Sequence, residues 1–116
     1  MKTLLLAIIG LLALTISGYS DPISSATLAW DVHPQFDVNQ YRLYQGTASR
    51  AYTVTNTING RTNNQAVSTN LQPWKIYYWA VTAVSTNGLE SDYSLEVSIT
   101  NAGTAPINLR IQSAAP

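Results

Sequence analysis

The strongest constraint on the fold is an alternating run of side chains in the second half of the 116-residue chain. Residues 77–84 alternate between two sets of side chains, and one set consists of Tyr77, Trp79, Val81 and Ala83. A period of two is typical of a strand with two distinct faces. Residues 26–30 and 41–45 show the same alternation, so the sequence predicts a chain built from strands.

The segment before this run carries a second signal, Leu71-Gln72-Pro73-Trp74-Lys75-Ile76-Tyr77. A Leu-x-Pro-x-x-x-Tyr sequence leading into a strand is similar to the tyrosine corner of β-sandwiches, where the chain crosses between sheets. There the Tyr hydroxyl bonds to backbone a few residues upstream, because each unpaired buried polar group costs about 1–3 kcal/mol. The pattern predicts Tyr77 as the corner residue.

The order of these segments resembles a bacterial-type fibronectin type III domain over residues 26–100. Leu28-Ala29-Trp30-Asp31 is similar to that family's second strand, and Tyr41-Arg42-Leu43-Tyr44-Gln45-Gly46-Thr47 to its third. The resemblance implies an all-β fold, a fibronectin type III or immunoglobulin-like β-sandwich of two antiparallel sheets. Its first strand is expected to be short or missing, since only residues 21–25 are left for it. The expected core consists of Trp30, Tyr41, Leu71, Tyr77 and Trp79.

Composition agrees with one domain of this kind. The chain has no cysteine and only 10% charged residues, while Thr, Ser, Asn, Val and Tyr, which favour strands and turns, are abundant. Because no disulfide can form, the apolar core must carry the stability of the domain, typically about 5–15 kcal/mol.

The first twenty residues have the pattern of a secretory signal peptide. Lys2 supplies a positive charge, residues 4–16 form an apolar run, and residues 18–20 suit a signal peptidase. A helix of thirteen residues spans only about 20 Å, less than the roughly 30 Å of a membrane core. We expect residues 1–20 to be removed, residues 21–100 to form the domain, and residues 101–116 to form a linker and tail. The expected location is secreted, extracellular or at the cell surface, with the periplasm as an alternative, and without stable membrane insertion after cleavage.

The charge balance excludes two classes of partner. After cleavage five Lys and Arg remain against six Asp and Glu. Nucleic acid binding needs a basic patch that displaces counterions, and charge-driven membrane contact needs a similar excess. We therefore expect neither of these partners.

Few residues suggest catalysis. His33 is the single histidine, and with Asp31 and Asp37 it could form a metal site. A loop that contains Pro34 explains the same polar residues, and no nucleophile elbow is present. Glu90 and Glu96 are expected in a turn and on an outward strand face, which does not suit paired carboxylates of a glycosidase. We expect no enzyme activity, no cofactor and no metal, and keep a hydrolase or metal protein centred on His33 as an alternative.

The sequence Asn59-Gly60-Arg61 has two interpretations. Some cell-surface receptors bind such a peptide, but Asn-Gly is first a hairpin turn signal, here between residues 53–58 and 65–69.

Exposed aromatic residues form the candidate binding surface. Tyr44 and Tyr78 fall on the outward phase of two neighbouring strands, with Trp74 at the corner and Arg42 on the same phase. Such residues can stack on sugar rings or anchor a protein partner. They can equally stabilise the sheet by cross-strand pairing, with Arg42 over a Tyr ring.

The tail has a strand pattern of its own. Ile107, Leu109 and Ile111 alternate with polar residues, and residues 105–111 are similar to the first strand of a fibronectin type III domain. We expect residues 106–112 to pair with an exposed sheet edge, on the same domain or on a neighbouring copy. The alternatives are a loose stub or a remnant of a second domain.

The sequence therefore predicts a secreted, non-catalytic binding or structural module with a role in adhesion, spacing or assembly. Its partner is expected to be a protein, a carbohydrate or a second copy of the chain. A carbohydrate-contacting module that uses the exposed aromatics is the main alternative.

Overall fold

The computed structural model describes residues 11–13 and 22–116, which contain seven strands and no helix. The strands are β1 (Leu11–Ala13), β2 (Ala26–Ala29), β3 (Val38–Gly46), β4 (Val54–Asn59), β5 (Gln65–Ser68), β6 (Lys75–Ser85) and β7 (Val97–Asn101). They form a three-stranded sheet in the order β1-β2-β5 and a four-stranded sheet in the order β4-β3-β6-β7.

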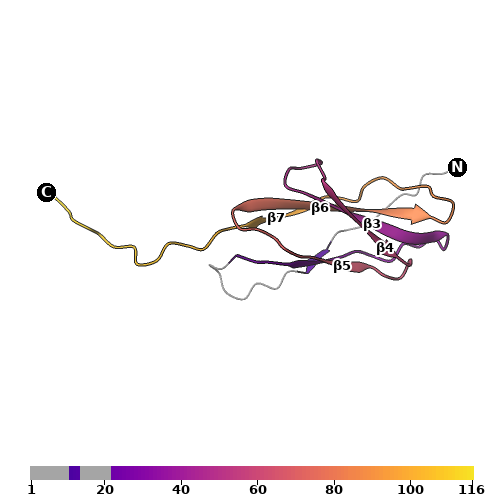
Figure 1. The fold of residues 1–116 in the computed structure, drawn as a ribbon, viewed down its shortest axis with the longest axis horizontal. Helices are drawn as coiled ribbons and strands as arrows, with labels where there is room; N and C mark the ends of the chain where they lie inside the picture. The colour runs from indigo at the N-terminus through magenta and orange to yellow at the C-terminus, as the bar shows by residue number, and fades with distance from the viewer. Residues whose placement is uncertain (1–10, 14–21) are drawn as a thin grey trace.

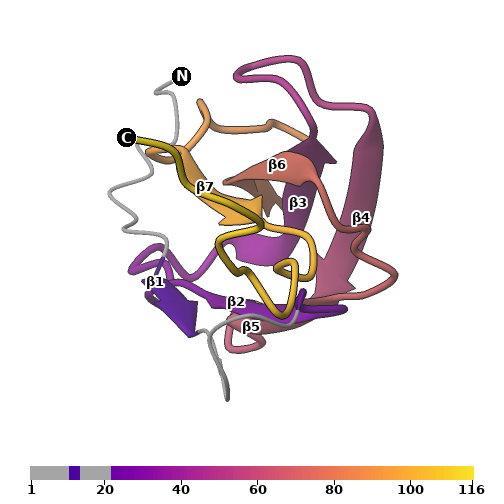
Figure 2. The ribbon, with the colours of Figure 1, turned by 90° about the vertical axis from the view of Figure 1, so that its left-hand side faces the viewer.

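All neighbouring strands run antiparallel, and the two sheets face each other as layers (Figures 1 and 2). The predicted β-sandwich of two antiparallel sheets is confirmed. No helix in the described part of the chain could cross a membrane.

The core lies between the layers, where the alternation of β2, β3 and β6 places their apolar side chains. The five residues expected in the core are all buried. Trp30 and Tyr41 meet edge to face with ring centroids 5.3 Å apart, and Tyr77 stacks on Trp79 at 6.0 Å. The corner is present, because the Gln72 backbone N–H donates to the Tyr77 hydroxyl at 2.7 Å.

The first strand is short, and its origin was not foreseen. The three residues of β1 pair with β2 at the edge of the smaller sheet, with Leu12 opposite Leu28. They belong to the predicted signal peptide, whose other residues lie outside the described part of the chain.

The prediction of a hairpin at Asn59-Gly60 is wrong. The strands before and after it, β4 and β5, belong to different sheets, so the segment between them crosses from one layer to the other. Gly60 has a φ of +100°, and its N–H donates to the Asn39 carbonyl at 2.8 Å. The Asn-Gly turn therefore serves a crossover.

The end of the domain is held by Asn101, which the sequence had assigned to the linker. It is the last residue of β7 and is only 2% exposed. Its side chain accepts from the Ile23 N–H at 2.9 Å and donates to the Ile23 and Gln72 carbonyls, each at 2.8 Å. One amide therefore joins the start of the domain, the corner and the last strand.

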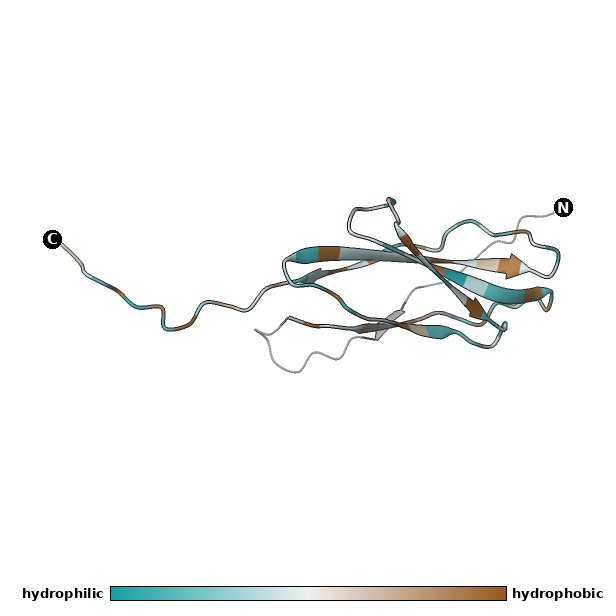
Figure 3. Ribbon diagram, viewed as in Figure 1, coloured by the Kyte–Doolittle hydropathy of each residue, from teal (hydrophilic) through white to brown (hydrophobic). Residues whose placement is uncertain are grey.

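Beyond Asn101 the chain leaves the sandwich along its long axis (Figure 1). Residues 102–116 contain no strand, and Ile107, Leu109 and Ile111 are at least 80% exposed. Apolar segments recur along this tail (brown in Figure 3). In this single chain, the expected strand over residues 106–112 is not formed.

Candidate binding face

The outer side of the four-stranded sheet carries the candidate site. Tyr44 and Arg42 project there from β3 and lie opposite Ala80 and Thr82 of β6. Their neighbours come from two loops, residues 47–53 and residues 86–96, which flank the sheet.

Two serines hold the second loop against the edge of β6. The Ser91 and Ser94 N–H groups donate to the Ala83 and Val81 carbonyls at 2.8 and 2.9 Å. Their hydroxyls accept from the Ala83 and Val81 N–H groups at 2.9 and 3.0 Å. Because both serines face the edge of β6, Tyr93 between them is placed over the outer face.

Glu90 is the centre of a hydrogen-bond network on this face. One carboxylate oxygen accepts from Arg42 at 2.7 Å, the single ion pair found in the described residues. The other accepts from the Tyr44 hydroxyl and, at 2.7 Å, from the Thr82 hydroxyl. The sequence allowed Arg42 to lie over a Tyr ring; in the structure it pairs with this carboxylate.

Glu96 repeats the arrangement beside the first loop. It accepts from the Ser49 hydroxyl at 2.6 Å, the Arg50 backbone N–H at 2.9 Å and the Tyr52 hydroxyl at 2.5 Å. The loops on both sides of the sheet are thus fixed by one carboxylate each.

Three tyrosine rings meet between the two carboxylates. Tyr93 packs edge to face on Tyr44 at 5.0 Å and on Tyr52 at 5.2 Å, and Tyr44 lies 6.0 Å from Tyr52. Edge-to-face contact is a favoured aromatic geometry, worth about 0.5–1.5 kcal/mol per pair beyond area burial. Tyr44, Tyr52, Tyr93, Glu90 and Glu96 together are called the tyrosine face below.

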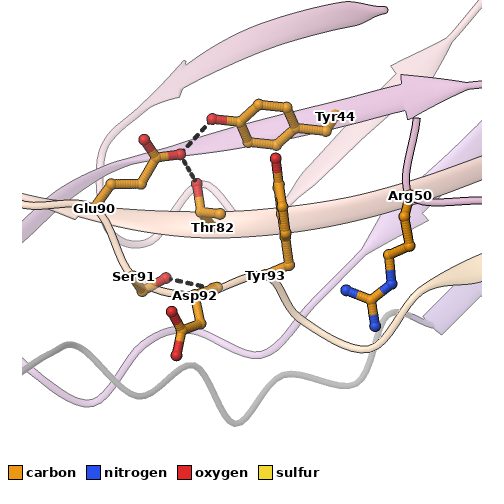
Figure 4. A pocket seen from close by; sticks show the side chains of 7 residues that line it. All are labelled: Tyr44, Arg50, Thr82, Glu90, Ser91, Asp92 and Tyr93. Atoms are coloured by element: carbon orange, nitrogen blue, oxygen red, sulfur yellow. Dashed lines mark hydrogen bonds between the residues drawn. The ribbon is translucent and has the colours of Figure 1, made fainter. Parts of the chain in front are cut away.

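A shallow hollow of about 510 Å³ opens beside these rings. It is lined by Tyr44, Arg50, Thr82, Glu90, Ser91, Asp92 and Tyr93. Figure 4 shows Glu90 joined to Tyr44 and Thr82 on one side of the hollow, with Arg50 on the other and Tyr93 between.

The hydrogen bonds shift the titration of these groups. Burial alone would raise the pKa of Glu90, but bonds from Tyr44 and Thr82 and the charge of Arg42 outweigh it and hold the pKa below its ordinary value. Bonds from Ser49 and Tyr52 likewise outweigh burial and lower the pKa of Glu96. The pKa of the Tyr44 and Tyr52 phenols is raised, first by burial and then by the hydrogen bond that each phenol donates to a glutamate carboxylate. Near neutral pH both carboxylates are ionised and both phenols are protonated.

The structure brings together some of the predicted surface residues and separates others. Tyr44 and Arg42 are joined through Glu90. Tyr78 lies opposite Gly46 and is half-buried, and the ring contacts found in the described residues do not include it with Tyr44. Trp74 lies just before β6, six residues along the chain from Ala80, which is opposite Tyr44. Six residues of strand span roughly 20 Å, so Trp74 lies far from Tyr44 along the sheet.

Trp74 serves the end of the domain. It has a φ of +67°, its N–H donates to the Asn101 carbonyl at 2.6 Å, and its side chain is 75% exposed. Its ring lies against Gly103, where an added Cβ would come within 1.9 Å of two ring carbons. Only glycine fits beneath the ring at that position.

His33 is a buried structural residue. It is 2% exposed, its Nδ1 accepts from the Gln35 N–H at 3.1 Å, and its own N–H donates to the Tyr41 hydroxyl at 2.8 Å. Asp31 and Asp37 are exposed, and the described residues hold no group of three potential metal ligands. The structure does not gather the metal cluster considered from the sequence.

The sequence did not reveal Tyr52, Tyr93, Glu90 or Glu96 as members of the site. All four lie in or beside loops, and no periodicity places a loop residue over a particular strand. The available signal was the Tyr41-Arg42-Leu43-Tyr44 strand alone, because Glu90 lies 46 residues beyond Tyr44 in the sequence.

Comparison with known proteins identifies the family to which this fold belongs. A scan against protein-family models and a search of curated proteins both found no match. Among solved structures, the chain is 33% identical to a Fn3-like protein from Clostridium thermocellum, with a TM-score of 0.54. The match covers 65% of this chain and 74% of that one. The chain belongs to the fibronectin type III family.

Other similar structures are more distant in sequence and show the fold alone. The sixth fibronectin type III domain of human fibronectin type III domain containing protein 3 is 22% identical, with a TM-score of 0.58. That match covers 81% of this chain and 98% of that one. A β-1,2-glucanase from Parabacteroides distasonis matches over 78% of this chain and 14% of its own, at 22% identity and a TM-score of 0.58. Fibronectin type III domains are in general non-catalytic binding or structural modules.

Proposed function

We propose that this fibronectin type III domain is exported and binds a protein partner through the tyrosine face. The observation that carries the proposal is the set of three tyrosine rings in mutual contact on the outside of the sheet. Tyrosine is enriched at interface hot spots because it offers a large, rigid surface with a polar tip.

The face is ordered before any partner arrives. Glu90 and Glu96 each accept three hydrogen bonds, so the phenols of Tyr44 and Tyr52 are already oriented. A preorganised surface loses less conformational entropy on binding, which favours affinity.

The same contacts favour a protein over a carbohydrate. A sugar ring stacks on an open, flat aromatic face, but here the rings of Tyr44 and Tyr93 stand at 89° to each other. Both carboxylates are engaged by donors of the chain itself, so their capacity to accept sugar hydroxyls is reduced. The likeness to part of a glucanase is one of fold and gives no support for a sugar ligand.

Export is proposed from the pattern of residues 1–20. Expression in a secreting bacterial host tests it, with an expected mature chain that begins at Asp21 by intact mass. A chain recovered only in the cytoplasm, with its first twenty residues, would contradict export.

Photo-crosslinking tests the binding face. A benzoylphenylalanine at position 93 should capture a discrete protein in the native host, while the same residue at Val67 should not. Val67 is a matched control because it is 55% exposed on the smaller sheet. Equal labelling at both positions, or retention on a panel of polysaccharides that Tyr93→Ala abolishes, would contradict the proposal.

A further inference from the structure

The edge of β2 has a partner that export would remove. β2 pairs with β5 on one side and with β1 on the other. β1 consists of Leu11–Ala13, which lie inside the segment expected to be cleaved. Cleavage after Ser20 would leave the N–H and C=O groups of this edge without strand partners, which favours pairing with another chain.

The tail has the opposite property, a strand sequence without a sheet. Ile107, Leu109 and Ile111 are 80%, 97% and 84% exposed and alternate with Asn108 and Arg110. Residues 107–111 therefore have a single apolar face that is exposed in this structure.

We propose that residues 105–111 of one copy add to β2 of a second copy, in the position that β1 occupies here. The proposal rests on the export proposed above. It makes the domain a unit of head-to-tail chains, each copy supplying the first strand of the next.

The direction of the strands favours a second copy. β2 runs away from the end of the sandwich where Ile23 and Asn101 are bonded, and the tail leaves from that same end (Figure 1). A strand antiparallel to β2 must enter from the opposite end. The tail of a copy stacked along the long axis enters there directly, without reversing its course.

The length of the tail opposes closure within one chain. From Asn101, the six residues to Ile107 reach at most about 22 Å when fully extended. The path from Ile23 to Trp30 along β2 is itself roughly 23 Å. Nothing remains for the turn that must reverse the chain before pairing starts.

The pairing has one register that suits both strands. With Leu109 opposite Leu28, Ile107 lies opposite Trp30 and Ile111 opposite Ala26. These three β2-segment residues are each 3% exposed and face the core. A slip of one residue would turn Asn108 and Arg110 inward, so the register is strongly specified.

The two ends of the sandwich also carry apolar residues that stacking would cover. Phe36 is 85% exposed and lies in the loop after β2. Leu89 is 44% exposed and lies in the loop after β6. The Thr86 N–H donates to the Asp37 carbonyl at 2.8 Å and joins these loops. Trp74, 75% exposed, lies at the other end beside the root of the tail.

Disulfide trapping tests the register, because the chain has no cysteine. Thr27→Cys and Arg110→Cys face outward and would be opposite each other across two copies. The two single variants, exported, mixed and oxidised, should give a mixed dimer on a non-reducing gel. Ser98→Cys mixed with Arg110→Cys is the matched control, since Ser98 lies on the other sheet, and it should give none.

The size of the exported chain tests the assembly. Light scattering should show species above the monomer that grow with concentration. Leu109→Lys should abolish them, and Asn108→Lys, the neighbouring outward position, should preserve them. Leu109 is 97% exposed in the single chain, so its substitution leaves the domain folded, as an unchanged melting curve of the monomer would show.

Three results would overturn the inference. One is a monomer at all concentrations whose intact mass shows that residues 1–20 have been removed, which leaves the export proposal standing. Another is a Thr27→Cys/Arg110→Cys double variant that closes its disulfide only within a monomer. The third is an exported chain that retains residues 11–13, so that β1 still covers the edge of β2; this result contradicts cleavage after Ser20 but leaves export itself standing.

Discussion

The side chain of Asn101 offers the sharpest test of how the domain is held together. Asn101→Ala removes three hydrogen bonds, two to Ile23 and one to Gln72. Each such bond contributes about 0.5–1.5 kcal/mol net, so the variant should lose about 3 kcal/mol of unfolding free energy. For a domain of this size each kcal/mol lowers the melting temperature by roughly 4–8 °C.

Urea denaturation and thermal melting at pH 7 measure this loss. Ser98→Ala is the control, since it removes an exposed side chain from the same strand and should change stability by less than about 0.5 kcal/mol. Asn101→Asp keeps the acceptor for the Ile23 N–H but sets a carboxylate against two carbonyl oxygens, so it should not rescue the loss. If Asn101→Ala costs no more than the control, the amide does not join the three segments.

Three other changes test the core, the corner and the tyrosine face. Tyr77→Phe removes the acceptor of the Gln72 N–H and should cost about 1–3 kcal/mol in urea denaturation, so an unaltered midpoint would disprove the corner. Trp30→Ala should cost about 3–5 kcal/mol and leave little folded protein by circular dichroism, unless Trp30 contributes no packing. Because the pKa of Glu90 is lowered in the folded state, its charge stabilises the domain above the unfolded pKa of about 4.3, and this gain is lost as pH falls through the folded pKa. Glu90→Gln should therefore be less stable than wild type at pH 7, and the difference should shrink as the pH falls below the unfolded pKa of about 4.3; a difference that does not change with pH would refute this.

The sequence was informative where one residue type repeats with the period of a strand. The alternation of residues 77–84 located β6 and its buried face, and the corner pattern located the bond from Gln72 to Tyr77. Both features depend on local spacing, which a single sequence records directly.

The tyrosine face could not be predicted in the same way. Tyr93 reaches β3 only because Ser91 and Ser94 substitute their hydroxyls for backbone acceptors along β6. This loop geometry has no period, so its partners are set by the folded structure. Trp74 shows the opposite error, since closeness to the corner in sequence did not bring it near Tyr44.

The role of Asn101 could not be predicted from the sequence for a different reason. Asparagine followed by Ala and Gly is typical of a linker, and hydrophobicity gives no hint that its amide is buried. The need for it arises from the unpaired backbone of Ile23 and Gln72, which become neighbours only after folding.

The contact of Trp74 with Gly103 provides an optical probe of the tail. Of the three tryptophans, Trp30 and Trp79 are buried, so iodide in solution would quench mainly the emission of Trp74. The indole lies on the first residues of the tail, and any event that pulls or covers them changes its surroundings. The protein thus reports the state of its own tail by intrinsic fluorescence, without a label, and Trp74→Phe gives the background emission of the two buried tryptophans.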